Sequence, residues 1–208
     1  MVTVIQVKNL FLLCLLCPWF LFADAVELQV AKLDATIGAT LDAIYAEKTE
    51  ALSNLEKEAR VRAVLEENYD LSVLIRRAIG RNWNRLNSDE QAELLELVKQ
   101  LVVSAYVGNM KRFSRPEVSF EDPIVISQRR MEIPSTVTSE DASVSVLYRL
   151  GRLESGWQVY DIVAEDISLV ANYRQQIDDH FRKKSAQELI ARLKEILKKK
   201  EIRDASLP

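Results

Sequence analysis

The spacing of apolar residues in this sequence changes twice, and each change restricts the secondary structure that can form. From Val30 to about residue 113, apolar residues recur every three or four positions, as they do on one face of a helix. This period ends at Pro116, and residues 116–165 are rich in β-branched and aromatic residues that loosely alternate with polar ones. Helical spacing returns after residue 168. Helices, then strands, then helices predict an α+β fold.

The first helical segment, 26–113, divides into four helices. The first has an apolar face formed by Val30, Leu33, Ile37, Leu41 and Ile44, and the second continues with Leu52, Leu55, Ala59 and the group from Val61 to Leu65. Asp70 is placed to cap a third helix that ends near Gly80, and Ser88 with Gln91 forms a capping box for the fourth, 89–113. Residues 101–107 are apolar nearly all round, which indicates a helix covered on more than one side.

The segment 116–165 predicts three or four antiparallel strands in a twisted sheet with one wet and one dry face. Val144, Val146, Tyr148 and Leu150 share one face of a strand, and Ser143, Ser145 and Arg149 lie on the other. Two C-terminal helices follow within 168–200. The first, 168–184, carries a stripe of Leu169, Tyr173, Ile177 and Phe181, and the second, 186–200, opens with the capping box Ser185 to Glu188.

The N-terminus, residues 1–25, has the features of a cleavable secretory signal peptide. Lys8 precedes an apolar run from Leu10 to Phe22, and 23–25 reads Ala-Asp-Ala. The run is too short to span a bilayer. Both cysteines lie in this segment, so a mature chain of 26–208 forms no disulfide and no thiolate metal site. We expect an exported, monomeric single domain, and its net charge of -3 does not suggest nucleic acid as a partner.

Few residues suggest catalysis, a cofactor or a metal. His180 is the only histidine, and its neighbours Asp178 and Asp179 do not face it on a helix. No glycine-rich phosphate loop and no metal-ligand spacing occurs, so we expect no enzyme and no cofactor. The basic run 194–200 is either a solvated helix end that complements the helix dipole or a docking patch for an anionic partner.

Two stretches together resemble one protein family. The C-terminal stretch "WQVYDIVAEDISLVANYRQQIDDHF", followed by "ELIARLKE", resembles the signature of the MlaC-like, toluene-tolerance family of periplasmic phospholipid-binding proteins. Upstream, "YDLSVLIRRAIGRNWNRLNSDEQAELLELVKQLVVSAYVGNMKRF" is similar to the family as well. Relatives usually have glycine where this chain has Asp166, and this leaves open whether it belongs to the hopanoid-associated branch.

The resemblance implies a carrier that moves phospholipid between membranes through the periplasm. Its implied partners are an MCE-domain ABC transporter complex at the inner membrane and an outer-membrane lipoprotein complex. Such a carrier must enclose the acyl chains, because each methylene kept from water contributes about 0.8 kcal/mol. We therefore expect an apolar pocket between the sheet and the helices of a cone-like domain.

The pocket lining is predicted from both halves of the chain. The candidates are Leu74, Ile75, Leu94, Val98, Leu101, Val102, Ala105 and Tyr106 on helices, and Val144, Val146, Tyr148, Val159, Leu169 and Tyr173 on the sheet side. Taken singly, each is as well explained by ordinary core packing. Arg174 either meets a head-group phosphate at the rim or forms a surface salt bridge.

Other classes of protein stay open on the sequence alone. A carrier of hopanoid or another hydrophobic solute would use the same pocket. An enzyme on the cone-shaped fold of nuclear-transport-factor-like domains would need a buried Asp or Tyr in a polar pocket. An adaptor or chaperone would have no pocket and would use the basic tail and the helical faces.

Overall fold

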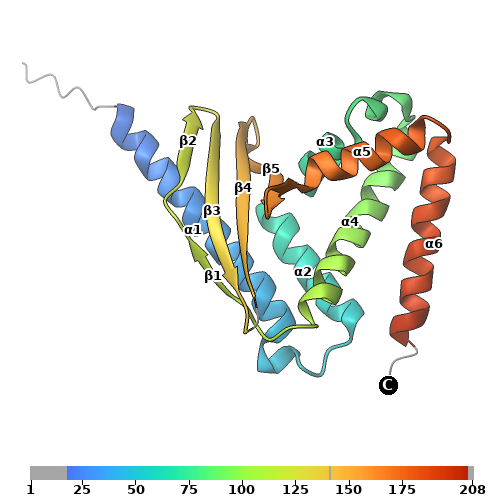
Figure 1. Ribbon diagram of the computed structural model, residues 1–208, viewed down its shortest axis with the longest axis horizontal. Coiled ribbons are helices and arrows are strands. Elements are labelled where there is room, and N and C mark those ends of the chain that lie inside the picture. Colours follow the sequence, from blue (N-terminus) through green and yellow to red (C-terminus); the bar gives the residue numbers. More distant parts are fainter. Residues whose placement is uncertain (1–17, 141, 206–208) are drawn as a thin grey trace, which may run out of the picture.

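The computed structural model describes residues 18–140 and 142–205 (Figure 1). The helices are α1 (Pro18–Tyr45), η1 (Glu47–Thr49), α2 (Asn54–Asn68), α3 (Leu71–Ile79), η2 (Gly80–Arg85), α4 (Ser88–Met110), α5 (Leu169–Phe181) and α6 (Ala186–Ala205). The strands are β1 (Glu117–Phe120), β2 (Ile124–Ser127), β3 (Arg130–Thr138), β4 (Ser143–Leu153), β5 (Gly156–Ala164) and β6 (Ile167–Ser168). This order of elements confirms the expected α+β class.

The long helix α1 runs along the sheet, and the other helices stand beside both (Figure 1). Helix α2 packs on α1, α4 packs between α2 and α6, and α3 pairs with α5 near the end of β5. Residues 1–17, which hold most of the predicted signal peptide, lie outside the described residues. Among the helices that are described, none combines the length and hydropathy needed to cross a bilayer.

Helix ends follow the sequence signals closely, with one correction. The Asp70 carboxylate accepts from the Ser72 amide at 2.9 Å, and α3 ends at Gly80, whose φ of 58° suits glycine. The capping box of α4 is not Ser88 with Gln91 but Asn87 with Glu90, one residue earlier. The side-chain Nε2 of Gln91 instead donates to the carbonyl of Leu86 at 3.2 Å. Asparagine caps as well as serine, so the sequence offered two competing starts.

The sheet has six strands rather than three or four. Its order is β1-β3-β4-β5-β6, all antiparallel, and β2 also pairs with β3. The first predicted strand is divided into β1 and β2 around Pro123, because proline has no amide hydrogen for the ladder. The two-residue strand β6 had no separate signal in the sequence.

One face of the sheet is apolar, as the alternation predicted. The register places Met131 opposite Leu150 and Ile133 opposite Tyr148. These side chains meet α1 in a buried cluster, which we call the sheet cluster: Val26, Leu33, Tyr69, Met131, Ile133, Leu150, Trp157 and Val159. Met131, Ile133 and Leu150 are fully buried, and each contributes roughly 1.5–3 kcal/mol through removal from water. The apolar stripe of α1 therefore packs on the sheet.

The apolar face of α2 differs in part from the predicted one. Val61 is buried as predicted, but Leu55 is 71% exposed, Ala59 is exposed and Lys57 is buried. The buried face of α2 is set by its contacts with α1 and α4. Spacing alone did not show which side of the helix these neighbours would cover.

A buried carboxylate, Asp161, joins the last strands to α5. Its Oδ2 accepts from the Ser168 hydroxyl at 2.7 Å and from the Arg149 guanidinium at 3.2 Å. Its Oδ1 accepts from the backbone amides of Ile162 at 2.9 Å and Val170 at 3.2 Å. One side chain thus ties β4, β5, β6 and the first turn of α5 together.

The turn between β5 and β6 needs no glycine. Glu165 and Asp166 have φ values of 47° and 63°, and Ala164 pairs with Ile167 across them. Two positive φ values are typical of a type I′ hairpin turn, and aspartate tolerates this region better than most residues. The Glu165 carboxylate accepts from the Ser145 amide at 2.7 Å, which holds the turn against β4. The cap of α5 is Ser168, whose hydroxyl accepts from the Ala171 amide at 3.0 Å.

We expect Asp161→Asn to lower the free energy of unfolding by about 2–3 kcal/mol, because it removes a buried charge that four donors surround. Urea unfolding followed by circular dichroism measures this loss. Asp179→Asn is the control, since Asp179 pairs with Arg182 on the surface and both side chains are more than half exposed. Equal effects of the two substitutions would contradict the structural role of Asp161.

Candidate functional site

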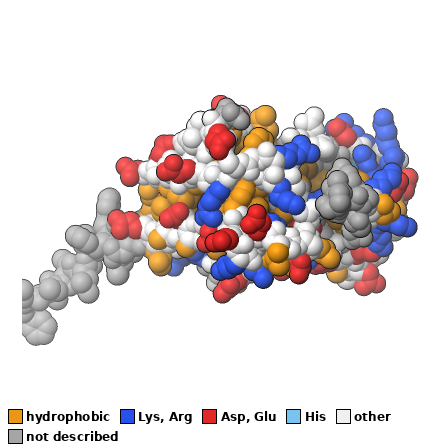
Figure 2. Space-filling model, turned by 90° about the horizontal axis from the view of Figure 1, so that it is seen from below, with side chains coloured by type: hydrophobic (Ala, Val, Ile, Leu, Met, Phe, Trp, Pro, Cys, Tyr) orange, Lys and Arg blue, Asp and Glu red, His pale blue; other side chains and the backbone are white. Residues whose placement is uncertain are grey.

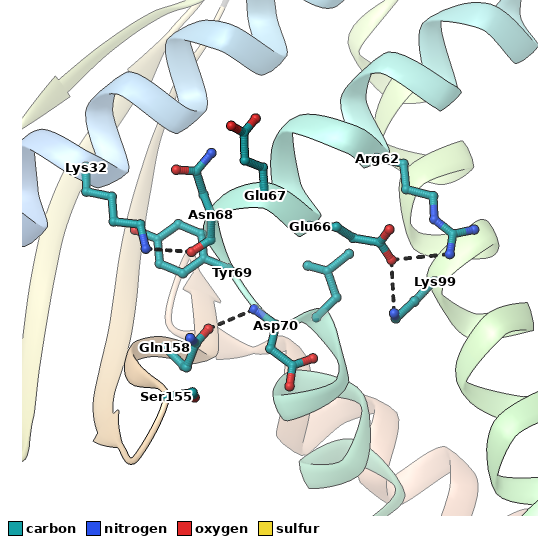
Figure 3. A pocket seen from close by; sticks show the side chains of 11 residues that line it. Lys32, Arg62, Glu66, Glu67, Asn68, Tyr69, Asp70, Lys99, Ser155 and Gln158 are labelled. Carbon is teal, nitrogen blue, oxygen red and sulfur yellow. Dashed lines mark hydrogen bonds and ion pairs between the residues drawn. The ribbon is translucent and has the colours of Figure 1, made fainter.

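An open pocket of about 550 Å³ lies where α1, α2, α4 and the β4–β5 turn meet (Figure 3). Its lining is mostly polar and charged: Lys32, Arg62, Glu66, Glu67, Asn68, Tyr69, Asp70, Leu71, Lys99, Ser155 and Gln158. We call it the mouth pocket. It is open to solvent, so it is not the enclosed apolar cavity that the sequence led us to expect.

Charges of both signs balance along one wall of the mouth pocket. Lys99 binds Glu66 at 2.9 Å, and Arg62 binds Glu66 at 3.2 Å and Glu96. Burial raises the pKa of Glu66, but the hydrogen bonds from Arg62 and Lys99 outweigh it and leave that pKa below its usual value. Bonds from the two glutamates also raise the pKa of Arg62. This wall therefore stays ionised at neutral pH.

The opposite wall of the mouth pocket is formed by Lys32 and Tyr69. The Lys32 ammonium donates to the Asn68 carbonyl at 2.6 Å and lies 4.6 Å from the centre of the Tyr69 ring. Among the described residues, Lys32 has no carboxylate partner. Figure 3 shows the Tyr69 ring turned toward α1 and away from Arg62 and Lys99. Tyr69 thus separates the mouth pocket from the sheet cluster, to which its ring belongs.

The hydroxyl of Tyr69 is buried and has no hydrogen-bond partner among the described residues. The residue is 6% exposed, and burial raises its pKa to about 12, so the phenol keeps its proton at physiological pH. An unsatisfied buried hydroxyl costs about 1–3 kcal/mol. Such a group in a natural structure calls for an explanation.

A second open pocket, about 410 Å³, lies on the polar face of the sheet beside α5. Its lining includes Arg77, Arg130, Arg149, Tyr160 and Arg174. The Arg174 guanidinium donates to the Arg77 carbonyl at 2.9 Å, in the last turn of α3. Within the described ranges Arg174 has no carboxylate partner, and it lines this second pocket rather than the mouth pocket. Its predicted role at the head-group rim remains a prediction.

The predicted lining residues are distributed over three apolar clusters. Val159, with Leu74 and Tyr148 packed against it, belongs to the sheet cluster. Ile75, Leu94 and Val98 belong to a cluster of α3, α4, α5 and α6, and Tyr106 packs on a third cluster of α1, α2 and α4. Leu101, Val144 and Val146 are half-buried, whereas Val102, Ala105, Leu169 and Tyr173 are exposed.

The structure adds residues that the sequence reasoning did not assign to the site. Val26 and Leu33 of α1, Met131 and Ile133 of β3, and Tyr69 all belong to the sheet cluster. The stripe of α1 and the alternation of β3 were visible in the sequence. What was missing was the information that α1 covers the sheet and that Tyr69 closes its edge.

The single histidine is engaged in helix packing. The His180 Nε2 lies 2.9 Å from the Ser185 carbonyl, and its ring meets Phe181 edge-on. The neighbouring carboxylates bind other groups, Asp178 to Asn82 at 2.6 Å and Asp179 to Arg182 at 3.1 Å. Within the described part of the chain, no three His, Cys, Asp or Glu side chains gather as metal ligands would.

The basic C-terminal helix is partly buried at its end. Lys200 contacts the backbone and hydroxyl oxygens of Ser104 and lies 3.3 Å from the Glu58 carboxylate, so it fixes α6 to α2 and α4. Lys194 pairs with Glu93 and Lys199 with Glu195. On the face drawn in Figure 2, Lys and Arg side chains are interspersed with Asp and Glu, and hydrophobic side chains show between them.

Comparison with known proteins gives a family and a fold. The sequence model of the family described as MlaC protein matches residues 34–195. The structure is similar to that of the phospholipid-binding protein from Ralstonia solanacearum, solved in complex with a phospholipid, with a TM-score of 0.70 and 22% identity over 79% of this chain and 94% of that one. A search of curated proteins finds no match. Because the family match spans most of the sequence, the chain belongs to the MlaC family.

Proposed function

We propose that this protein is a periplasmic carrier of phospholipid that holds acyl chains between the apolar face of its sheet and the helices around it. The observation that carries the proposal is the sheet cluster, a continuous apolar layer that Tyr69 separates from a solvent-open pocket with three cations. The similar Ralstonia solanacearum protein, which was solved with phospholipid, supports the same use of this fold.

Members of this family bind lipid and are not catalysts, so the expectation of a non-enzyme is confirmed. The free energy of shielding an acyl chain from water determines how completely a carrier must enclose it. An acyl chain of about 14 carbons loses roughly 11 kcal/mol of stabilisation if water reaches all of it. The carrier must therefore enclose the chains completely, and a surface groove would not be sufficient.

The sheet cluster is filled by its own side chains, so lipid entry requires movement. We propose that α1 moves away from the sheet and that acyl chains take the place of its contacts with the sheet. The proposed lining comprises Leu74, Tyr148, Val159, Val144 and Val146 of the residues predicted from sequence, together with Val26, Leu33, Met131 and Ile133. This exchange of apolar contacts for apolar contacts keeps the interior densely packed in both states.

The head group would remain at the mouth pocket. Lys32 is the cation best placed for a phosphate there, because it lies against Tyr69 at the edge of the sheet cluster and has no carboxylate partner among the described residues. Arg62 and Lys99 are already paired with glutamates on the far wall. A phosphate at Lys32 would form a charge-assisted contact at little cost to existing pairs.

Family membership supports the remaining parts of the proposal. MlaC proteins are periplasmic, and we propose that residues 1–25 direct export and are then removed. The partners would be an MCE-domain ABC transporter complex at the inner membrane and an outer-membrane lipoprotein complex, with the carrier acting as a monomer between them. A hopanoid or another hydrophobic solute is the alternative cargo.

Lipid retention tests the proposal directly. Protein expressed from the full sequence and purified from a bacterial periplasm should carry phospholipid, which native mass spectrometry and organic extraction would detect. Val146→Glu should abolish retention while the fold persists, because Val146 is half-buried on the apolar face of β4. Thr138→Glu, on the opposite face of the sheet, is the control. A clean lipid-free mass for the unsubstituted protein would refute the carrier.

The charge of Lys32 gives a separate prediction. Lys32→Gln should weaken binding of an anionic phospholipid about tenfold, the loss expected for one charge-assisted hydrogen bond. Fluorescent-lipid displacement at low and high salt measures this effect, which should shrink as salt rises. Lys48→Gln, at an exposed position in η1, should bind as the unsubstituted protein does. If the unsubstituted protein, Lys32→Gln and Lys48→Gln all bound the lipid with the same affinity, the phosphate would not bind at Lys32.

A further inference from the structure

The unpartnered hydroxyl of Tyr69 cannot easily turn to find a partner, because the backbone on both sides of it is fixed. Tyr69 ends α2, and its amide donates to the Leu65 carbonyl at 2.8 Å. The next amide, that of Asp70, donates to the Gln158 side chain at 2.8 Å. On the ring itself lies the Lys32 ammonium. The hydroxyl is therefore held inside the molecule as a donor without an acceptor.

Two other tyrosines can be compared with Tyr69, and both lie near each other. Tyr148 of β4 packs against the sheet cluster, and burial, followed by the nearness of Tyr106 and Tyr69, raises its pKa. The Tyr106 hydroxyl lies 3.3 Å from the Thr40 hydroxyl, so it has a partner. Tyr69 is buried and has no such partner among the described residues, whereas Tyr106 is half-buried.

The surroundings restrict which acceptor would suit Tyr69. A charged oxygen would lose too much hydration among Val26, Leu33 and Ile133, whereas a neutral carbonyl oxygen can be buried if it is hydrogen-bonded. The arrangement of groups is also informative: Lys32 lines the solvent-open mouth pocket, and Tyr69, whose hydroxyl is buried, belongs both to that lining and to the apolar cluster. A glycerophospholipid presents phosphate, ester carbonyl and acyl chain in that order.

We infer that Tyr69 donates a hydrogen bond to an ester carbonyl of the bound lipid and thereby selects ester-linked glycerolipids over purely hydrocarbon cargo. This inference rests on the proposed function and specifies its ligand. The described residues offer this donor no acceptor, and the ester carbonyl of the proposed ligand would supply one. The mouth pocket would then select lipids by the charge of the head group, and Tyr69 would select ester-linked over ether-linked acyl chains.

The test compares two synthetic phosphatidylglycerols with identical chains, one ester-linked and one ether-linked, since an ether lacks the carbonyl. The protein is purified from the periplasm and freed of lipid by detergent exchange, and dissociation constants are measured by displacement of a fluorescent lipid. The unsubstituted protein should bind the ester lipid about tenfold more tightly. Tyr69→Phe should lose this preference and bind both lipids as the unsubstituted protein binds the ether lipid.

Thermal unfolding of the lipid-free protein separates recognition from structure. Tyr69→Phe should unfold at the same temperature or higher, because it removes an unsatisfied group. Tyr45→Phe is the matched control: it loses the hydrogen bond that the Tyr45 hydroxyl donates to the Met110 carbonyl, so it should unfold at a lower temperature yet keep the preference for the ester lipid. A purely structural tyrosine at position 69 would instead lower the unfolding temperature and leave the linkage preference unchanged.

The remaining outcomes are decisive. Equal affinity of the unsubstituted protein for both lipids, or an undiminished ester preference in Tyr69→Phe, would overturn the inference and leave the carrier function intact. Failure of the unsubstituted protein to bind either lipid would overturn the proposed function, and the inference with it.

Discussion

The buried carboxylate of Asp161 fixes strands β5 and β6 to β4 and to the start of α5. It accepts hydrogen bonds from β4, from its own strand, from β6 and from the first turn of α5. Because of these bonds, the strand that contributes Trp157 and Val159 to the apolar face cannot move independently of the helix that follows it. If acyl chains replace the contacts of α1 with the apolar face of the sheet, as proposed, this rigid connection keeps the sheet itself unchanged.

The two faces of the sheet divide the chemistry of the protein. On one face, Met131, Ile133 and Leu150 form an apolar layer under α1. On the other, Arg149 bridges Glu132 and Asp161 across three strands. Successive side chains of a strand point to opposite faces, so a single sheet can carry apolar residues on one face and charged residues on the other. Polar bonds can therefore fix the sheet without entering the space proposed for lipid.

The proposed site is not a preformed cavity, because its apolar layer is packed by its own side chains. Among the described residues, the buried hydroxyl of Tyr69 lacks a hydrogen-bond partner. A carrier has to release its cargo as well as bind it, and an empty state that can close by self-packing limits the cost of release. The unsatisfied donor works in the opposite direction and favours the loaded state.

The sequence by itself determined the order of elements, the apolar face of β4, and the caps Asp70 and Ser185, because periodicity and capping are local properties. The residues Trp157, Val159, Asp161 and Ser168 also carried the family resemblance that the match to residues 34–195 confirmed. Only the tertiary structure decided that α1 covers the sheet, that Asn87 caps α4, that Leu169 and Tyr173 are exposed, and that Tyr69 separates a charged pocket from an apolar layer. Periodicity shows which side of an element is apolar, but the neighbour that covers it comes from distant parts of the chain.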